Sequence, residues 1–292
     1  MKKIVKRFLI QSILLLLLLL GLNLQAQVPT GHNLDFSTGG YINWIAKTGN
    51  YDGTSSQPIF NWTSTWVDPT QASDEGERFF VIYNGGTDTN SLNQLSRVPE
   101  GFTHSSQINK AKGDGHCSQL QYTMEVNLEN CLLTFMYAMV LQAPGHSGYE
   151  NPTFQIDVMK HSSDNGQMLE ELVDPCAFFE KSSNAQLPTT EPELWHEGSN
   201  DWHGLWIWSN WQQIKINLTR YIGDRITIRV RISDCYSTHG GYGYFTAKAE
   251  PALISTPGCA GNGDTVTIAA APSGFESYKW FEISSTFLSQ DE

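Results

Sequence analysis

The chain has 292 residues, a formal net charge of −12 and 12% aromatic residues, with nine tryptophans among them. This amount of apolar and aromatic material excludes a disordered chain. The acidic balance disfavours a nucleic-acid partner, because an acidic surface repels the phosphate backbone.

The N-terminus has the pattern of a secretory signal peptide. Basic residues occupy four of the first seven positions, leucine fills 14–20, and Ala26 precedes Gln27. This order is typical of a cleaved leader, and the apolar run is shorter than the ~20 residues of a membrane-spanning helix. We therefore predict a signal peptide at 1–26 and a mature chain that is secreted or at the cell surface, without a membrane span. Removing the leader raises the excess of acidic groups to 16.

After residue 27 the hydrophobic pattern has period two. In 225–232, four apolar residues alternate with four polar ones, and only an extended strand places all four on one face. Residues 131–141 are apolar nearly throughout, which indicates a central strand buried on both faces. In chain order, strands are predicted at 41–46, 78–83, 119–126, 131–141, 154–158, 213–218, 225–232, 242–249 and 265–269.

The connections between these strands are rich in Gly and Pro, and no window shows a long amphipathic helix. Many strands with such connections favour an all-β sandwich or barrel. The 230 residues of 27–256 fit one large β-sandwich. After a break at 254–258, Cys259, an alternating stretch and Trp280 match the opening half of an immunoglobulin-like domain, which needs ~100 residues. We therefore expect an incomplete immunoglobulin-like domain at 257–292 and a chain that is a fragment of a longer protein.

The densest feature is the tryptophan-rich segment 194–208. Its Gly, Ser, Asn and Asp content predicts a loop. Indole faces on a loop suit the apolar faces of sugars, and nearby carboxylates suit sugar hydroxyls. The alternative is that the rings cap the core, which we expect for Trp211 and Trp208. The predicted glycan contacts are Trp195, Trp202, Trp206, Asp201 and Glu197.

The same segment offers His196, Glu197, Asp201 and His203, but their spacing matches no metal-ligand motif. Asp-Gly pairs elsewhere suit a structural Ca²⁺ or plain turns equally, so no metal or other cofactor is assigned. No nucleophile, zinc-protease or phosphate-loop motif is present. We therefore predict no catalytic residues and a protein that is not an enzyme.

Three stretches resemble a known family. They are 34–44, the block 133–154, and the run from Trp211 to Phe245 that includes Asp234-Cys235 and a Gly-rich turn. They resemble the large, MAM-like jelly-roll modules of Bacteroidota surface proteins, many of which take part in gliding or adhesion and are associated with type IX secretion. The resemblance covers most of 33–250 and implies a jelly-roll β-sandwich.

Five cysteines with wide spacing and no C-x-x-C pattern argue against a zinc ribbon. A hairpin between the predicted strands 119–126 and 131–141 would place Cys117 and Cys131 at opposite ends, too far apart for a disulfide. The family resemblance instead suggests a bond between Cys176 and Cys235.

These observations predict a non-catalytic extracellular or cell-surface binding or adhesion module, with glycans or other surface macromolecules as partners. The alternative is an accessory carbohydrate-binding domain of a secreted hydrolase whose catalytic domain lies beyond residue 292.

Overall fold

The computed structural model describes residues 32–54, 56–63, 68–69, 78–83, 85–164 and 167–252. The predicted signal peptide at 1–26 and the predicted immunoglobulin-like segment at 257–292 lie outside these ranges. Within them, no helix is long and apolar enough to cross a membrane.

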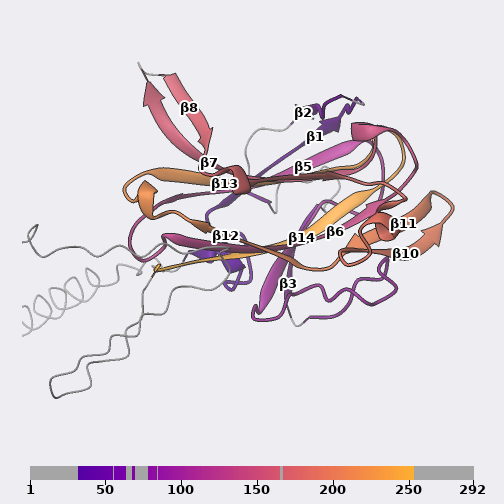
Figure 1. The fold of residues 1–292 in the computed structure, drawn as a ribbon, viewed down its shortest axis with the longest axis horizontal. Coiled ribbons are helices and arrows are strands. Elements are labelled where there is room, and N and C mark those ends of the chain that lie inside the picture. Colours follow the sequence, from indigo (N-terminus) through magenta and orange to yellow (C-terminus); the bar gives the residue numbers. More distant parts are fainter. Residues whose placement is uncertain are drawn as a thin grey trace, which may run out of the picture. The chain divides into compact units, whose positions relative to one another are not determined.

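The described residues form two antiparallel sheets that face each other (Figure 1). One sheet, here called sheet A, has the order β2-β1-β5-β13-β7-β8, with β9 also paired to β7. Its strands are β1 (Trp44–Tyr51), β2 (Phe60–Trp62), β5 (His116–Glu125), β7 (Thr153–Asp164), β8 (Gln167–Leu172), β9 (Phe178–Ser182) and β13 (Arg225–Ser233).

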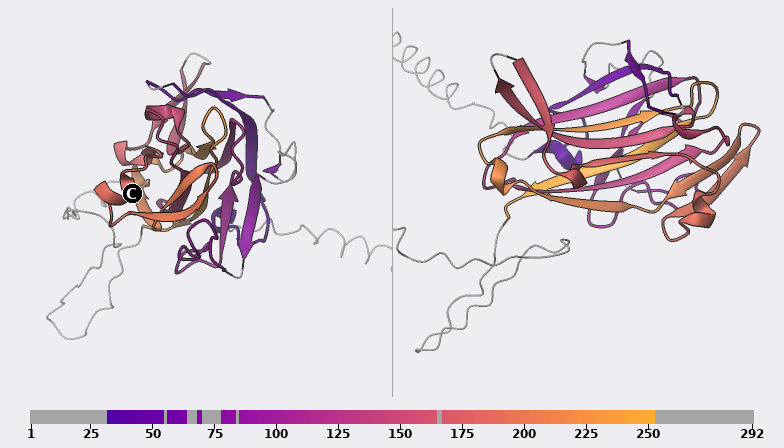
Figure 2. Two further views of the ribbon diagram at one scale, coloured as in Figure 1. Left: turned by 90° about the vertical axis from the view of Figure 1, so that its right-hand side faces the viewer. Right: turned by 45° about the horizontal axis from the view of Figure 1, so that its top comes forward.

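The other sheet, sheet B, has the order β10-β11-β6-β14-β4-β3, with β12 also paired to β6. Its strands are β3 (Phe79–Tyr83), β4 (His104–Ile108), β6 (Leu132–Gln142), β10 (Trp195–Asp201), β11 (Gly204–Ser209), β12 (Gln212–Asn217) and β14 (Gly241–Glu250). Both layers and the nearly aligned strands are visible in the tilted view of Figure 2.

The strand pairing is that of a jelly roll. The four strands β4, β5, β6 and β7 pair, in that order, with β14, β13, β12 and β9. The first strand of this series therefore pairs with the last, the second with the one before it, and so on inward. Successive strands alternate between the two sheets, which is the winding of a double Greek key. The predicted all-β, jelly-roll β-sandwich is confirmed over the described residues.

The helices that lie within the described residues are short: η1 (Asn33–Asp35), η3 (Gly148–Glu150), η4 (Pro175–Ala177), α2 (Leu187–Thr190) and η5 (Thr219–Tyr221).

The main core lies between the sheets and follows the period-two pattern. In β13 the four apolar residues face inward and are fully buried, while Arg229 and Arg231 face outward. In β6 both faces are buried, as the apolar run predicts. The second face is covered because the connection 85–103 lies over the outer side of sheet B, and the aromatic side chains of β11 and β14 pack beneath it.

The predicted hairpin between 119–126 and 131–141 is wrong. β5 belongs to sheet A, where it pairs with β1 and β13, whereas β6 belongs to sheet B. The short connection at 126–131 crosses from one sheet to the other. Val126 donates its backbone N–H to Asp224 and Leu218 donates to Cys131, so the crossing is held by neighbouring connections rather than by a turn within one sheet.

The predicted Cys176–Cys235 disulfide is also absent, because Cys235 is a buried free thiol. The strand register explains this. Cys176 lies beyond the point where Phe178 pairs with Asp157, and Cys235 follows Ser233, which pairs with Thr153 at the other end of β7. Four to five residues of strand separate these points, or about 15 Å, whereas bonded Cα atoms lie about 4.4–6.8 Å apart.

Candidate binding site at one end of the sandwich

Three connections meet at one end of the sandwich and bring exposed aromatic rings and half-buried imidazole rings together. They are the β6–β7 connection, the two-residue turn of the β10–β11 hairpin and the β13–β14 connection. The hairpin projects at the right of Figure 1. The ring centroid of His146 lies 5.9 Å from that of Tyr236 and 5.2 Å from that of His239, and His203 lies 6.4 Å from His239. Trp202 and His203 pack against each other, with centroids 3.4 Å apart. We call His146, Trp202, His203, Tyr236 and His239 the loop-end cluster.

A buried carboxylate holds one of the connections that carry this cluster. Asp234 is fully buried and accepts hydrogen bonds from the Asn109 side chain (2.9 Å) and from the backbone N–H groups of Asp114, His116 and Gly241 (3.2–3.3 Å). Burial raises the pKa of the Asp234 carboxyl well above its usual range, and the nearby Asp114 carboxylate adds to this shift. One side chain thus ties the β4–β5 connection to the β13–β14 connection.

The same two connections also approach each other more closely than side chains would allow. A Cβ atom on Gly113 would lie 2.1 Å from the carbonyl oxygen of Thr238, and one on Gly240 would lie 2.5 Å from that of Ala111. Only glycine fits at these two positions. The Gly-rich turns of the sequence therefore serve close backbone contact at this end of the fold.

A second carboxylate fixes the hairpin turn. Asp201 accepts hydrogen bonds from the backbone N–H of His203 (2.8 Å), the indole N–H of Trp206 (3.0 Å) and the Gln142 side-chain amide (3.1 Å). Gln142 in turn accepts the backbone N–H of Gly240 at 2.7 Å. Asp201, predicted as a sugar ligand, therefore braces the turn and links the hairpin to the β13–β14 connection.

Two of the three predicted platform rings are buried, which corrects the sequence prediction. Trp195 is 1% exposed in the core between the sheets, and Trp206 is 2% exposed beneath the connection 85–103. The segment is a β-hairpin on the edge of sheet B, rather than a loop, and its apolar residues pack on both faces. Trp208 is buried with Trp206, as expected, and Trp211 is partly buried and donates its indole N–H to the Ser96 carbonyl.

Trp202 is the exception, with 88% of its surface exposed at the tip of the hairpin. Tyr236 is 57% exposed in the adjacent connection. Glu197 is exposed but lies on β10 opposite Ile207, before the bulge that precedes the turn. The sequence analysis weighed His203 only as a metal ligand and did not connect it with Tyr236, His146 and His239, because these positions in the chain are up to 93 residues apart.

The metal-type residues of the tryptophan-rich segment do not form one site. The His196 ring packs against Trp208, with centroids 4.4 Å apart, and Asp201 is engaged in the turn. A different group of ligand-type side chains comes together instead, made of His146, Cys235 and His239.

The outer face of sheet A carries a polar ladder that is a poorer candidate. Asp157 accepts hydrogen bonds from Arg229 (2.6 Å) and Arg231 (2.5 Å), and Arg231 also donates to Gln119 and Gln155. These groups satisfy one another and are mostly buried; the Asp157 side chain is 4% exposed. Little of their hydrogen-bonding capacity is left for a ligand.

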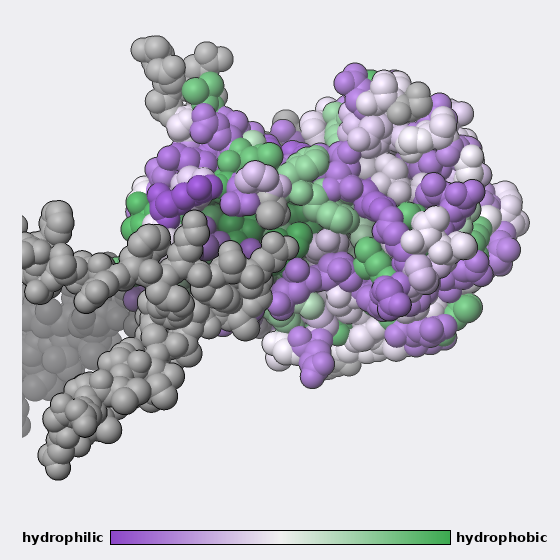
Figure 3. Space-filling model, viewed as in Figure 1, coloured by the Kyte–Doolittle hydropathy of each residue, from purple (hydrophilic) through white to green (hydrophobic). Residues whose placement is uncertain are grey.

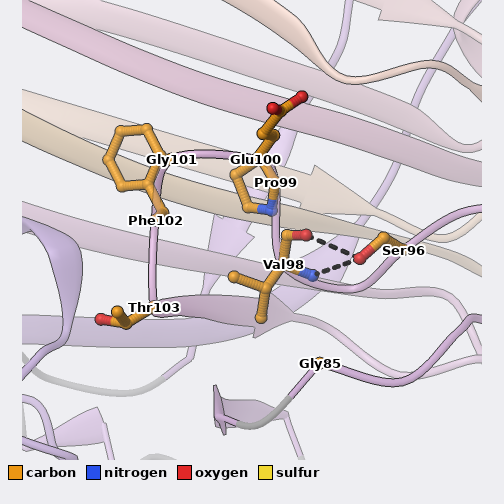
Figure 4. Close-up of a pocket in the computed structure, with 8 residues that line it drawn as sticks. All are labelled: Gly85, Ser96, Val98, Pro99, Glu100, Gly101, Phe102 and Thr103. Carbon is orange, nitrogen blue, oxygen red and sulfur yellow. Dashed lines mark hydrogen bonds between the residues drawn. The ribbon is translucent and has the colours of Figure 1, made fainter.

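A shallow pocket of about 570 Å³ lies within the β3–β4 connection (Figure 4). Its lining is largely small and apolar, and Glu100 is its single ionisable residue. The Ser96 hydroxyl holds Val98 through both backbone polar groups. Figure 3 shows a second, apolar area below the β7–β8 hairpin. Neither place gathers the polar and aromatic groups found in the loop-end cluster.

No family model and no curated protein matches the chain. Solved structures that it resembles include TmCBM61 in complex with β-1,4-galactotriose (12% identity; 75% of this chain and 96% of that chain; TM-score 0.32). Another is the family 11 carbohydrate-binding module from Clostridium thermocellum in complex with a β-1,3-1,4-mixed-linked tetrasaccharide (10%; 75% and 94%; 0.29). A third is the enzymatically active domain of bacteriophage CBA120 tailspike protein 4 (8%; 75% and 21%; 0.34). With TM-scores this low, none of these likenesses indicates what this chain binds or does.

Proposed function

We propose that this chain is a non-catalytic, extracellular binding module and that its ligand is a glycan contacted by Trp202 and Tyr236. The observation that carries the proposal is the 88% exposure of Trp202 on a braced turn. An indole is a large apolar surface, and leaving it in water forgoes the stabilisation that burial in the core would bring. Stacking on the apolar face of a pyranose ring would recover that stabilisation on binding.

The surroundings of Trp202 suit a sugar better than a purely apolar partner. His203 and Tyr236 offer imidazole and phenol groups that hydrogen bond to hydroxyls, and their rings lie within one contiguous cluster. Asp201 and Gln142 fix the turn from behind. A rigid aromatic surface with a few fixed polar groups is the usual composition of a small-ligand site.

The test is glycan binding by the full chain and two variants. A glycan array identifies the ligand, and titration calorimetry then measures its affinity for the wild type, Trp202→Ala and the control Leu128→Ala. Leu128 is also an exposed apolar residue, 69% exposed, but it lies in the β5–β6 connection at the opposite end of the sandwich.

We expect Trp202→Ala to weaken binding about tenfold or more, since loss of a central aromatic contact costs roughly 1.5–2 kcal/mol. Leu128→Ala should bind like the wild type. Retention of no glycan by the wild type, or equal affinities for the wild type and Trp202→Ala, would show that the proposed function is wrong.

A further inference from the structure

We propose that Cys235, His239 and His146 form a binding site for a transition-metal ion, with Zn²⁺ as the expected occupant. One ligand atom from each of these side chains lies within 4.8 Å of the other two. The site goes beyond the proposed glycan function, which needs no metal.

The distances are close to those that a bound ion requires. Nitrogen and sulfur ligands lie about 2.0–2.3 Å from Zn²⁺, so two ligands at a tetrahedral angle are about 3.3–3.6 Å apart. The sulfur of Cys235 and Nδ1 of His239 are 3.1 Å apart already. His146 is half-buried in a separate connection, and a closure of roughly 1 Å would complete the set.

The sulfur sits in a loop shaped to present it as an acceptor. The backbone N–H groups of Ser237 and His239 point at the Cys235 sulfur from 3.2 and 3.1 Å. The Cys235 N–H donates to the His239 carbonyl at 2.9 Å and closes the five-residue turn. Hydrogen bonds from backbone N–H groups to sulfur stabilise negative charge there, which suits a metal-bound thiolate.

Both imidazoles are oriented by backbone contacts, as metal-binding histidines usually are. Nδ1 of His146 lies 3.4 Å from the carbonyl oxygen of Glu150, so a proton on Nδ1 leaves Nε2 free to bind a metal. The ring of His239 hydrogen bonds with the backbone of His203, and its Nδ1 faces the sulfur. Each ring thus has one nitrogen held by the backbone and one available to an ion.

The chemistry of the set selects the metal. A thiolate with two imidazoles prefers Zn²⁺ and similar ions over hard cations such as Ca²⁺ and Mg²⁺, which take oxygen ligands. On binding, the Cys235 thiol loses its proton to solvent as the sulfur–zinc bond forms. Three protein ligands leave a fourth position for water or an external ligand.

Cobalt substitution tests the site in the full chain, purified under reducing conditions and freed of metal with a chelator. Co²⁺ is added to the wild type, Cys235→Ser, His146→Gln and two controls, and bound metal is also counted after equilibration with Zn²⁺. The controls are Cys131→Ser, another buried free cysteine, and His104→Gln, a histidine outside the site.

We expect one metal ion per chain, the visible absorption of tetrahedral Co²⁺ and a near-ultraviolet sulfur-to-cobalt charge-transfer band. Cys235→Ser should lose the charge-transfer band, and both site variants should bind Zn²⁺ at least roughly tenfold more weakly. The controls and Trp202→Ala should behave like the wild type, which separates this result from that of the glycan test. His146→Gln changes a half-buried surface ring, so it stays informative if Cys235→Ser does not fold.

Three outcomes would overturn the proposal. They are a wild type that binds neither Co²⁺ nor Zn²⁺, a charge-transfer band that persists in Cys235→Ser, and recovery of Cys235 in a disulfide when the protein is mapped without reductant.

Discussion

Replacing Trp206 by Ala should destabilise the fold strongly, whereas replacing Trp202 by Ala should hardly change its stability, although the two residues are only four positions apart. Trp206 is 2% exposed, packs with Tyr242 at a centroid distance of 5.6 Å, and donates its indole N–H to Asp201. Trp202 stands almost wholly in solvent. The sequence pattern alone treats the two residues as equivalent.

The expected magnitude for Trp206→Ala follows from the cavity. Truncation of a buried Trp costs about 3–5 kcal/mol, because lost burial and an unfilled cavity add. The lost hydrogen bond to Asp201 adds at most about 1 kcal/mol, since Asp201 is exposed and keeps its contacts with Gln142 and His203. Against a typical total stability of about 5–15 kcal/mol, this is a large fraction. Trp202→Ala should change stability by about 0.5 kcal/mol or less.

Urea unfolding followed by tryptophan fluorescence and circular dichroism measures both variants. The midpoint should fall strongly for Trp206→Ala and stay near the wild-type value for Trp202→Ala, with the slope of the transition unchanged. Losses of under about 1.5 kcal/mol for Trp206→Ala, or of more than about 2 kcal/mol for Trp202→Ala, would refute the assignment of the first ring to the core and of the second to the surface.

Two further predictions concern buried polar groups. Asp234→Ala should lower the free energy of unfolding by at least about 2 kcal/mol, because four hydrogen-bond donors lose their acceptor; the exposed Asp52→Ala serves as the control. Hydrogen exchange at the Asp114, His116 and Gly241 amides should accelerate, and unchanged exchange there would contradict the role given to Asp234. Burial raises the pKa of Tyr51 to about 12 and also raises those of Tyr41 and Tyr137. Between pH 10, where these tyrosines ionise in the unfolded chain, and about pH 12, where Tyr51 ionises in the folded chain, only the unfolded chain loses protons. Stability should therefore fall as pH rises from about 10 toward 12, with Tyr51 accounting for roughly 2–3 kcal/mol. Tyrosinate absorbance should therefore rise together with loss of circular dichroism, and ionisation of all eleven tyrosines near pH 10 in a folded chain would count against this.

The strands with a clear apolar pattern were predictable because each one carries its own signal, whereas the sequence analysis did not predict β2, β4, β8, β9, β10 and β11. The alternation in 225–232 requires one buried face whatever strand lies beside it, and β13 spans Arg225–Ser233. Pairing carries no such local signal. The connection 126–131 is short enough for a hairpin, yet it crosses between the sheets, because a short connection can join two strands of facing sheets as well as two of the same sheet.

The candidate site was less predictable than the fold. The run Leu205-Trp206-Ile207-Trp208 places apolar residues on both faces of a strand, which indicates burial on both sides. The sequence interpretation gave more weight to the polar residues of β10 and predicted a loop. The Cys-x-x-x-His spacing of Cys235 and His239 is visible in the sequence. His146 lies near them because the start of β7 pairs with the end of β13, so the connection before β7 and the connection after β13 lie at the same end of the sandwich. This neighbourhood depends on long-range strand order.

The arrangement of the loop end is determined by buried groups rather than by the loops themselves. Asp234 and Gln142 are buried, and each accepts a backbone N–H group of a neighbouring connection. Gln142 also donates its side-chain amide to Asp201 of the hairpin turn. Buried polar groups of this kind must stay paired for the fold to be stable. Any movement of one connection would therefore leave a partner unsatisfied in another. Trp202 and Tyr236 are consequently presented on a surface that is ordered before a ligand arrives. A ligand that stacks on these rings meets little ordering cost, and this is the physical condition under which a small exposed aromatic surface can bind with useful affinity.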